Sequence, residues 1–219
     1  MKVGIVSCVH GNETLGKEVV DRMVSFNQGN LFFIFANKKA FTQQKRFVDK
    51  DLNRCFPGKK FGCHEEMLAY DLMFKLKQDF VIDIHSTTAK TESFVIITKI
   101  NDKVKKLVRC IPLEKVVFME PQIANGKALI DHVNCGVAIE FGSDVDAFDV
   151  VLTTLKNLGV VNGKKKFVEQ KFYSVYGVLN GNKKFTNFKL SEDKGKLFYP
   201  VLHGEKHYGF TCMKAKKIE

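Results

Sequence analysis

The sequence lacks the features that mark membrane and secreted proteins. No stretch of its 219 residues approaches the roughly 18 consecutive apolar residues of a membrane span. The chain begins with a strand-like pattern, without a charged segment followed by a cleavable apolar one, so we expect no signal peptide. These absences predict a cytoplasmic protein that does not bind a membrane.

Paired cysteines are also missing. The six cysteines include no CxxC pair, and several lie in or beside apolar runs. We therefore expect buried free thiols, as in a reducing cytoplasm. Cys55, Cys63 and His64 lie near one another in the sequence, but their spacing fits no standard zinc pattern, so we expect no second metal site there.

Arginine is scarce in a chain of net charge +11. Of the 35 basic residues, 31 are lysine, and the longest basic run is only 164–166. Arginine is the residue suited to bidentate phosphate contacts, and dispersed lysines form no defined patch. We therefore expect no nucleic-acid partner, although the charge favours anionic small molecules as substrates.

Apolar runs alternate with helical patterns over the first three quarters of the chain. Strands are predicted at 3–9, 31–36, 80–84, 94–98, 116–119 and 136–141, and helices at 14–26, 63–77, 103–110 and 147–158. Residues 37–60 have no clean period and are predicted to form a long loop of functional importance. The alternation predicts an α/β fold, a three-layer sandwich with a mixed, largely parallel twisted sheet.

The pattern changes after Gly163. Short segments with alternating apolar and polar residues are separated by glycines, which is typical of β structure. We predict two domains, a catalytic domain at 1–162 and a small β-rich C-terminal domain at 163–219.

Three polar motifs follow apolar runs where strands are predicted to end. His10 and Glu13 follow the first strand, His85 ends the third, and Glu140 ends the last. Ligands of such sheets gather at the carboxyl ends of the strands, so these residues are expected to meet. Two His, one Glu and an open position form a ligand set of hydrolytic zinc, and a further Glu could activate a water.

Each motif also has a structural interpretation. Glu13 could be an N-terminal helix carboxylate, and His85 a hydrogen-bonded core histidine. Asp83 is a candidate partner of His85, although we expect strand alternation to point it the other way.

The stretch from Arg46 to Gly58 is the most specific in the chain. It holds two of the four arginines, and Asn53-Arg54 could bind a carboxylate, with the arginine bidentate. The alternative is a solvated basic loop, which is less favoured because the rest of the chain uses lysine.

Taken together, these motifs resemble the aspartoacylase/succinylglutamate desuccinylase family, which shares its core with zinc carboxypeptidases. The matching elements are HGNE at 10–13, RFVDKDLNR with FPG at 46–58, DIHST at 83–87 and AIEFG at 138–142, in family order. The segment from 199 to 208 also resembles the aspartoacylase C-terminus, more weakly.

The resemblance implies a role for each matching residue. It implies zinc as the cofactor, with His10, Glu13 and His85 as ligands. It implies that Glu140 is the general base and later the proton donor. The residues implied to contact the substrate are Arg46 at the scissile carbonyl oxygen, Asn53 and Arg54 at the carboxylate, and Tyr208 closing over it.

One segment departs from the family pattern. Aspartoacylases carry a Tyr and an Arg before the base glutamate, whereas residues 125–134 hold neither. Lys127 and His132 are the available substitutes, and Lys127 is our candidate for a second substrate-binding cation. Specificity for acetylaspartate, which has two carboxylates, is therefore not implied.

The predicted function is zinc-dependent hydrolysis of the amide of an N-acyl amino acid, a small-molecule substrate. A metallocarboxypeptidase-like peptidase, or another amidohydrolase on the same core, is the alternative enzyme. A non-catalytic binding protein is a third hypothesis, against which the four intact residues His10, Glu13, His85 and Glu140 argue. The sequence does not determine the oligomeric state, and a homodimer stays open.

Overall fold

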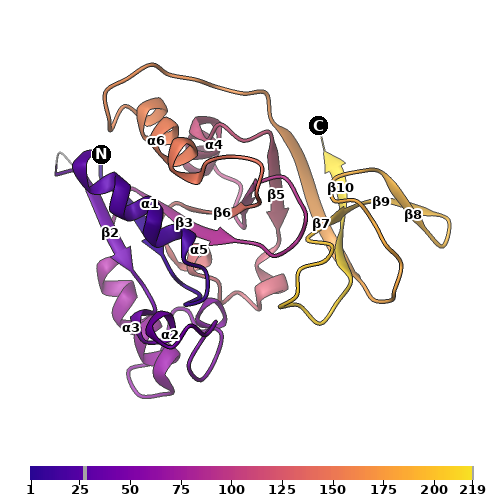
Figure 1. Cartoon of the computed structure of the whole chain (residues 1–219), viewed down its shortest axis with the longest axis horizontal. Helices are drawn as coiled ribbons and strands as arrows, with labels where there is room; N and C mark the ends of the chain where they lie inside the picture. Colours follow the sequence, from indigo (N-terminus) through magenta and orange to yellow (C-terminus); the bar gives the residue numbers. More distant parts are fainter. Residues whose placement is uncertain (27–28, 219) are drawn as a thin grey trace.

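One mixed sheet runs through the molecule (Figure 1). The structure is a computed structural model that describes all residues except 27, 28 and 219. Over these described residues the sheet has ten strands in the order β2-β1-β3-β6-β4-β5-β7-β10-β9-β8. The strands are β1 (Val3–Ser7), β2 (Leu31–Phe35), β3 (Phe80–Ser86), β4 (Phe94–Ile97), β5 (Lys115–Met119), β6 (Gly136–Phe141), β7 (Lys171–Leu179), β8 (Ser191–Asp193), β9 (Lys196–Val201) and β10 (Cys212–Ile218).

Helices cover both faces of the sheet, as Figure 1 shows. They are α1 (Leu15–Met23), α2 (Lys38–Thr42), α3 (His64–Lys75), α4 (Asp102–Cys110), α5 (Leu129–His132) and α6 (Ala147–Leu158), with short 3-10 turns at Val24–Phe26, Leu52–Arg54 and Pro121–Ala124. Helices α1, α4 and α6 share one hydrophobic cluster with the sheet, and α3 and α5 share another. The predicted three-layer α/β sandwich is therefore confirmed.

The alternation of side chains along each strand explains why there are two hydrophobic clusters, one on each face of the sheet. In β1, Val3 and Ile5 belong to the cluster of α1 and α6, whereas Val6 belongs to the cluster of α3. In β3, Ile82 likewise packs toward α1 and Val81 toward α3. Successive side chains point to opposite faces of a strand, and both faces are covered here, so the strands read as continuous apolar runs.

The mixed character of the sheet arises in its middle. Strands β2, β1, β3 and β6 pair in parallel, whereas β4 pairs antiparallel with β6. Consequently β1, β3 and β6 end at the same edge, which places His10, His85 and Glu140 together.

The strands of the C-terminal part extend the same sheet. β7 pairs in parallel with β5, and β10 then pairs antiparallel with β7 and β9. In Figure 1 a long connection leads from α6 to β7 across the top of the molecule. Residues 163–218 contain no helix, which agrees with their β-rich character, and the domain boundary at 162/163 stays a prediction.

The segment 37–60 is more ordered than a loop. It contains α2 and the turn Leu52–Arg54, and Asn37 begins α2 because its side chain accepts a hydrogen bond from the Ala40 N–H at 3.1 Å. The sequence pattern missed both elements because each is shorter than two turns of helix. The short helix α5, within 125–134, was missed for the same reason.

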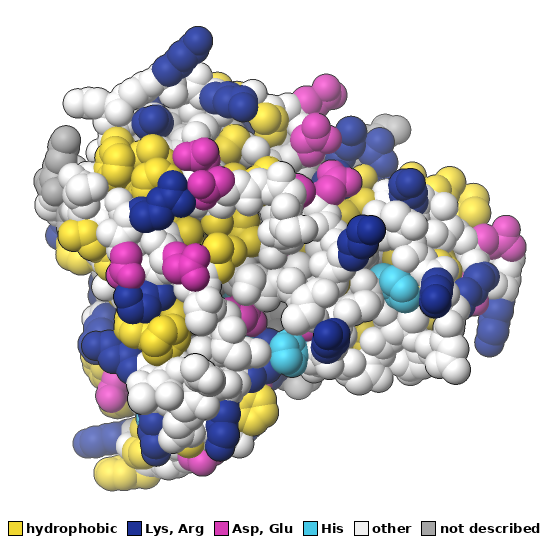
Figure 2. Space-filling model, viewed as in Figure 1, with side chains coloured by type: hydrophobic (Ala, Val, Ile, Leu, Met, Phe, Trp, Pro, Cys, Tyr) yellow, Lys and Arg dark blue, Asp and Glu magenta, His cyan; other side chains and the backbone are white. Residues whose placement is uncertain are grey.

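The face in Figure 2 agrees with the expectation from composition, and so do five of the six cysteines, which are buried, whereas Cys63 is half-buried. Lysine and arginine side chains are scattered over the face in Figure 2 and form no single patch. All six cysteines are free thiols, and burial raises the pKa of Cys8, Cys55, Cys135 and Cys212 to about 11. In the described part of the chain, no helix is long and apolar enough to cross a membrane.

Candidate metal centre and active site

Two neighbouring strands bring His85 and Glu140 side by side. In the parallel register of β3 and β6, His85 is the direct partner of Glu140. Partners in a parallel pair point to the same face, and here this is the face covered by α3 and α5. The two side chains therefore line the same cavity.

A tight turn after β1 supplies His10 and Glu13. Cys8 leaves the strand in the left-handed conformation, with φ of 55°. Gly11 then packs so closely that a Cβ atom would lie 2.3 Å from the backbone of Ala40, and its N–H donates to the Arg46 carbonyl oxygen at 3.0 Å. The glycine is thus required by close backbone approach, which joins this turn to the arginine-bearing segment.

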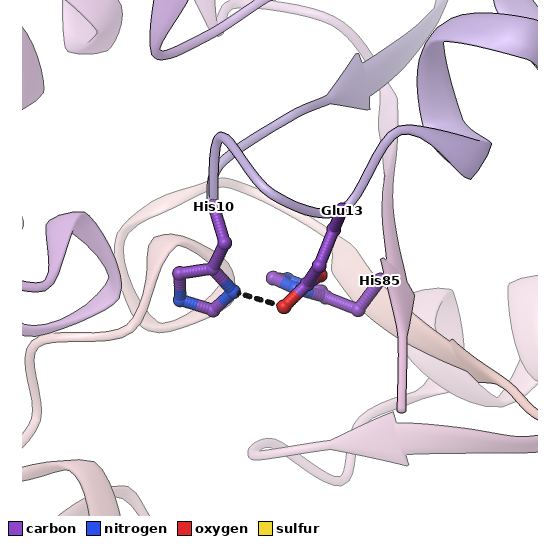
Figure 3. A group of neighbouring side chains, drawn as sticks. All are labelled: His10, Glu13 and His85. Atoms are coloured by element: carbon purple, nitrogen blue, oxygen red, sulfur yellow. Dashed lines mark hydrogen bonds and ion pairs between the residues drawn. The ribbon is translucent and has the colours of Figure 1, made fainter. Parts of the chain in front are cut away.

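His10, Glu13 and His85 converge on one point (Figure 3). The His10 Nδ1 atom lies 2.6 Å from Glu13 Oε1, and His85 Nδ1 lies 3.0 Å from Glu13 Oε2. The three residues are buried, with 4 to 7% of their surface exposed, and their ligand atoms lie within 4.8 Å of one another. This set of two imidazoles and one carboxylate can hold a metal ion.

Each histidine is oriented by a second carboxylate. The Nε2 atom of His10 lies 3.0 Å from Asp51 Oδ1, and that of His85 lies 2.9 Å from Asp83 Oδ2. Such outer carboxylates select the tautomer that leaves the inner nitrogen free for a metal. Our expectation that Asp83 points away was wrong, because residues two apart in a strand share a face.

The charges of the cluster depend on one another. Burial opposes ionisation of Glu13, but His10 and His85 hold the pKa of its carboxyl well below the ordinary value. Burial likewise opposes protonation of His85, but Asp83 and Glu13 raise the pKa of its imidazole well above the ordinary value. Without a metal the cluster therefore binds protons, which a divalent cation would replace.

Glu140 is the carboxylate of the cavity with a neutral-range pKa. Burial raises the pKa of Glu140 to about 7, with His85 lowering it and Glu13 raising it further. A carboxyl with this pKa can accept a proton and return it at neutral pH.

A buried glutamate shapes the segment that carries the arginines. Glu65, at the start of α3, accepts hydrogen bonds from the backbone N–H groups of residues 48, 49 and 50 and from the Asn37 side chain, at 2.6 to 3.1 Å. These bonds lower the pKa of Glu65 although its burial acts to raise it. The segment 46–54 is thus folded against α3, although the side chains of Phe47, Asp49 and Lys50 are exposed.

The same interactions explain a second acidic cluster. Asp49, Cys63 and Glu65 lie close enough to hold a metal ion. However, both oxygens of Glu65 accept backbone hydrogen bonds, and Asp49 Oδ2 accepts from the His64 N–H at 2.9 Å. These hydrogen bonds explain why the three residues lie close together: they hold the loop against the start of α3.

The folded segment aims its polar side chains at the cavity. Arg46 contacts Glu13 Oε1 at 2.9 Å and Asp51 Oδ2 at 3.6 Å. Arg54 donates to the Asn53 carbonyl oxygen at 2.8 Å, and Asn53 Oδ1 accepts from the Leu129 N–H at 2.8 Å. Arg46, Asn53 and Arg54 all line the cavity.

The C-terminal part closes another side. Glu205 accepts hydrogen bonds from Thr87 Oγ1, Thr88 N–H and Thr88 Oγ1 at 2.5 to 3.0 Å, which ties this part to the loop after β3. Tyr208 follows, stacks on Phe210 with ring centres 4.9 Å apart, and lines the cavity. Burial and the nearby Glu140 raise the pKa of Tyr208, so its hydroxyl is a hydrogen-bond donor at neutral pH.

Eight of the nine residues predicted from the sequence line one cavity, and Lys127 is the exception. Lys127 is exposed and lies outside the cavity wall. His132, the other substitute considered, is likewise outside and contacts the Gly126 carbonyl oxygen at 2.8 Å. Sequence reasoning missed Asp51 and Glu205, although Asp51 lies within the arginine-rich motif and so carried a signal.

Fold and site together define an α/β protein with a candidate metal centre beside a glutamate and two arginines. The model of the succinylglutamate desuccinylase/aspartoacylase catalytic domain matches residues 1–151. The chain therefore belongs to this family.

Individual relatives agree with this assignment. A probable aspartoacylase from Nostoc sp. is 30% identical over 164 residues, covering 65% of this chain and 55% of the relative. The chain thus spans about half the length of that relative. Murine aminoacylase 3 has a TM-score of 0.81 at 17% identity over 100% of this chain and 95% of its own. Succinylglutamate desuccinylase from Vibrio parahaemolyticus has a TM-score of 0.68 at 16% identity, over 100% and 82% of the two chains. These structural similarities concern the fold.

Proposed function

We propose that this chain is a zinc-dependent hydrolase that removes the acyl group from an N-acyl amino acid. Family membership supports this class of reaction. The observation that carries the proposal is the shared cavity of the buried His–Glu–His cluster, Glu140 and two arginines.

His10, Glu13 and His85 would hold the zinc ion. Their donor set fits, because two imidazoles already present inner nitrogens to the Glu13 carboxylate while Asp51 and Asp83 hold the outer ones. When bound, zinc lowers the pKa of a water molecule and polarises a carbonyl group.

Glu140 would move the proton twice. It takes a proton from the water as the oxygen attacks the acyl carbon, and it gives that proton to the amine nitrogen as the C–N bond breaks. The products are a carboxylate and a free amino acid. A pKa of about 7 suits both transfers.

The remaining residues would position the substrate. Arg46 stabilises the negative oxygen of the tetrahedral intermediate. Arg54 and Asn53 hold the substrate carboxylate, and Tyr208 closes the cavity. In this assignment 1–162 is the catalytic domain and 163–219 the β-rich domain that contributes the closing tyrosine.

A peptidase on the same core is the second candidate. The observation behind it is that Arg54, unlike the ion-paired Arg46, is available to bind the C-terminal carboxylate of a peptide. Release of free amine should be measured from N-acetyl and N-succinyl amino acids and from dipeptides, with zinc present. Turnover confined to peptides would contradict the deacylase assignment.

We expect Arg54→Lys to weaken substrate binding. Lysine keeps the charge but loses the fork that engages both carboxylate oxygens. A charge-assisted hydrogen bond contributes about 1.5–3 kcal/mol, so kcat/KM should fall by about tenfold or more. Arg109→Lys, on α4 outside the cavity, is the matched control and should retain wild-type kinetics. An unchanged kcat/KM in the Arg54 variant would remove this residue from the site.

Lys127→Ala is expected to affect all substrates alike. The lysine is exposed and lies outside the cavity wall, so it has no position from which to select a second substrate carboxylate. Kinetics with acyl-aspartate, acyl-glutamate and neutral acyl amino acids test this. A loss concentrated on the two dicarboxylic substrates would instead place Lys127 at the bound substrate.

A further inference from the structure

The cavity wall is chemically divided. One part carries the charged residues described above, from the turn after β1, the segment 46–54 and the ends of β3 and β6. The other part is apolar and comes from β4, β5, α5, β10 and the turn after β9: Ile96, Met119, Ile130, Leu202 and Met213. These residues also belong to the hydrophobic clusters, so the core itself forms this wall.

Two arginines line the cavity among the described residues, and one of them has no ion pair. Arg46 is paired with Glu13 and Asp51, whereas Arg54 forms no ion pair in the part of the chain that the structure describes. No lysine is among the described residues that line the cavity, so one substrate carboxylate would have a cationic partner and a second would have none.

Two carboxylates of the cavity would repel a second negative charge on the substrate. Glu205 and Glu120 both line the cavity. Glu205 is held ionised, because the hydrogen bonds from Thr87 and Thr88 lower the pKa of its carboxyl against the effect of burial. Glu120 is exposed at the end of β5, next to Met119. A substrate with a second carboxylate would therefore meet like charges beside an apolar wall.

We infer that the site takes N-acyl amino acids with a single carboxylate and an apolar side chain, not the N-acylated derivatives of aspartate or glutamate. This inference rests on the proposed function and names its substrate class. Arg54 binds the α-carboxylate, and the side chain packs on Met119, Ile130 and Met213. The sequence departure at 125–134 agrees with this, because Lys127, the lysine of that segment, is exposed and does not line the cavity.

Two substrate series test the inference with the zinc-loaded enzyme. In the first, the acetyl group is constant and the amino acid is leucine, methionine, phenylalanine, alanine, aspartate or glutamate. We expect kcat/KM to be at least about tenfold higher for leucine, methionine or phenylalanine than for alanine or the two acidic residues, since one methylene in a pocket changes it about 10–200-fold. In the second series the amino acid is leucine and the acyl group is acetyl or succinyl, so that a carboxylate on the acyl group is tested apart from one on the side chain.

Two variants test the wall directly. Met119→Ala should lower kcat/KM for N-acetylleucine more than for N-acetylalanine. Glu120→Lys should raise the ratio of N-acetylaspartate to N-acetylleucine turnover by about threefold or more, because repulsion becomes attraction at an exposed position. Glu169→Lys makes the same charge change outside the cavity and should leave that ratio unchanged. A uniform response to both lysine variants would contradict a local role of Glu120.

A binding measurement separates the two proposals. Calorimetric titration of the Glu140→Ala protein with N-acetylleucine and N-acetylaspartate should show tighter binding of N-acetylleucine by about tenfold. If the acidic derivatives bind and react best, the substrate class is wrong while the proposed deacylase function stands. If N-acetylleucine binds more tightly but no acyl amino acid is hydrolysed by the wild-type protein, the proposed function fails while the apolar specificity stands.

Discussion

Glu140→Ala is expected to keep its zinc and to lose hydrolysis. A general base contributes about 10²–10⁴ in rate, and one carboxylate serves here both as base and as proton donor, so kcat should fall by about 10⁴ or more. The large effect follows from the position of Glu140, which is the partner of His85 in the β3–β6 register and lines the same cavity. Steady-state kinetics and elemental analysis of the same sample measure both quantities.

Glu140→Gln is the matched variant. Glutamine has nearly the same size and can still form hydrogen bonds, but it cannot accept the proton from water. We expect it to be as inactive as the alanine variant, with similar zinc content. Near-normal kcat in either zinc-loaded variant would show that another group moves the proton.

His85→Ala is expected to lose most of its metal. His85 is buried, contacts Glu13 at 3.0 Å through Nδ1 and is held by Asp83 at 2.9 Å through Nε2. Loss of an outer hydrogen-bond partner costs about 10–100-fold in metal affinity, and removal of the ligand itself should cost more. Zinc content after dialysis, measured by elemental analysis, tests this.

His132→Ala provides the control for metal loss. His132 is half-buried and contacts a backbone carbonyl oxygen outside the cavity, so its removal should leave the zinc content unchanged. Full retention of zinc by the His85 variant would overturn the ligand assignment. Equal loss in both variants would indicate a general effect on folding and would likewise contradict a specific ligand role.

The fold class was predictable because the sheet is buried on both faces. Such strands read as apolar runs, for example 80–82 and 136–139, and the amphipathic helices α1, α4 and α6 have clear periods. Short elements such as α2 and α5 have too few residues to show a period. Tertiary contacts, such as the hydrogen bond that the Leu129 N–H donates to Asn53 Oδ1 at the start of α5, decide where they form.

By itself, the sequence determined which residue types stand at the strand ends. His10, His85 and Glu140 follow apolar runs that had to be buried strands, and parallel strands place their carboxyl ends at one edge, so their meeting was predictable. Only the tertiary structure decided which side chains support and surround them. Asp51 reaches His10 across 41 residues and Glu205 reaches Thr88 across 117, contacts that depend on how distant loops fold and not on any local period. The apolar wall of the cavity and the position of Lys127 outside the cavity were also decided only by the tertiary structure. Both depend on which side of each short element faces the hydrophobic core.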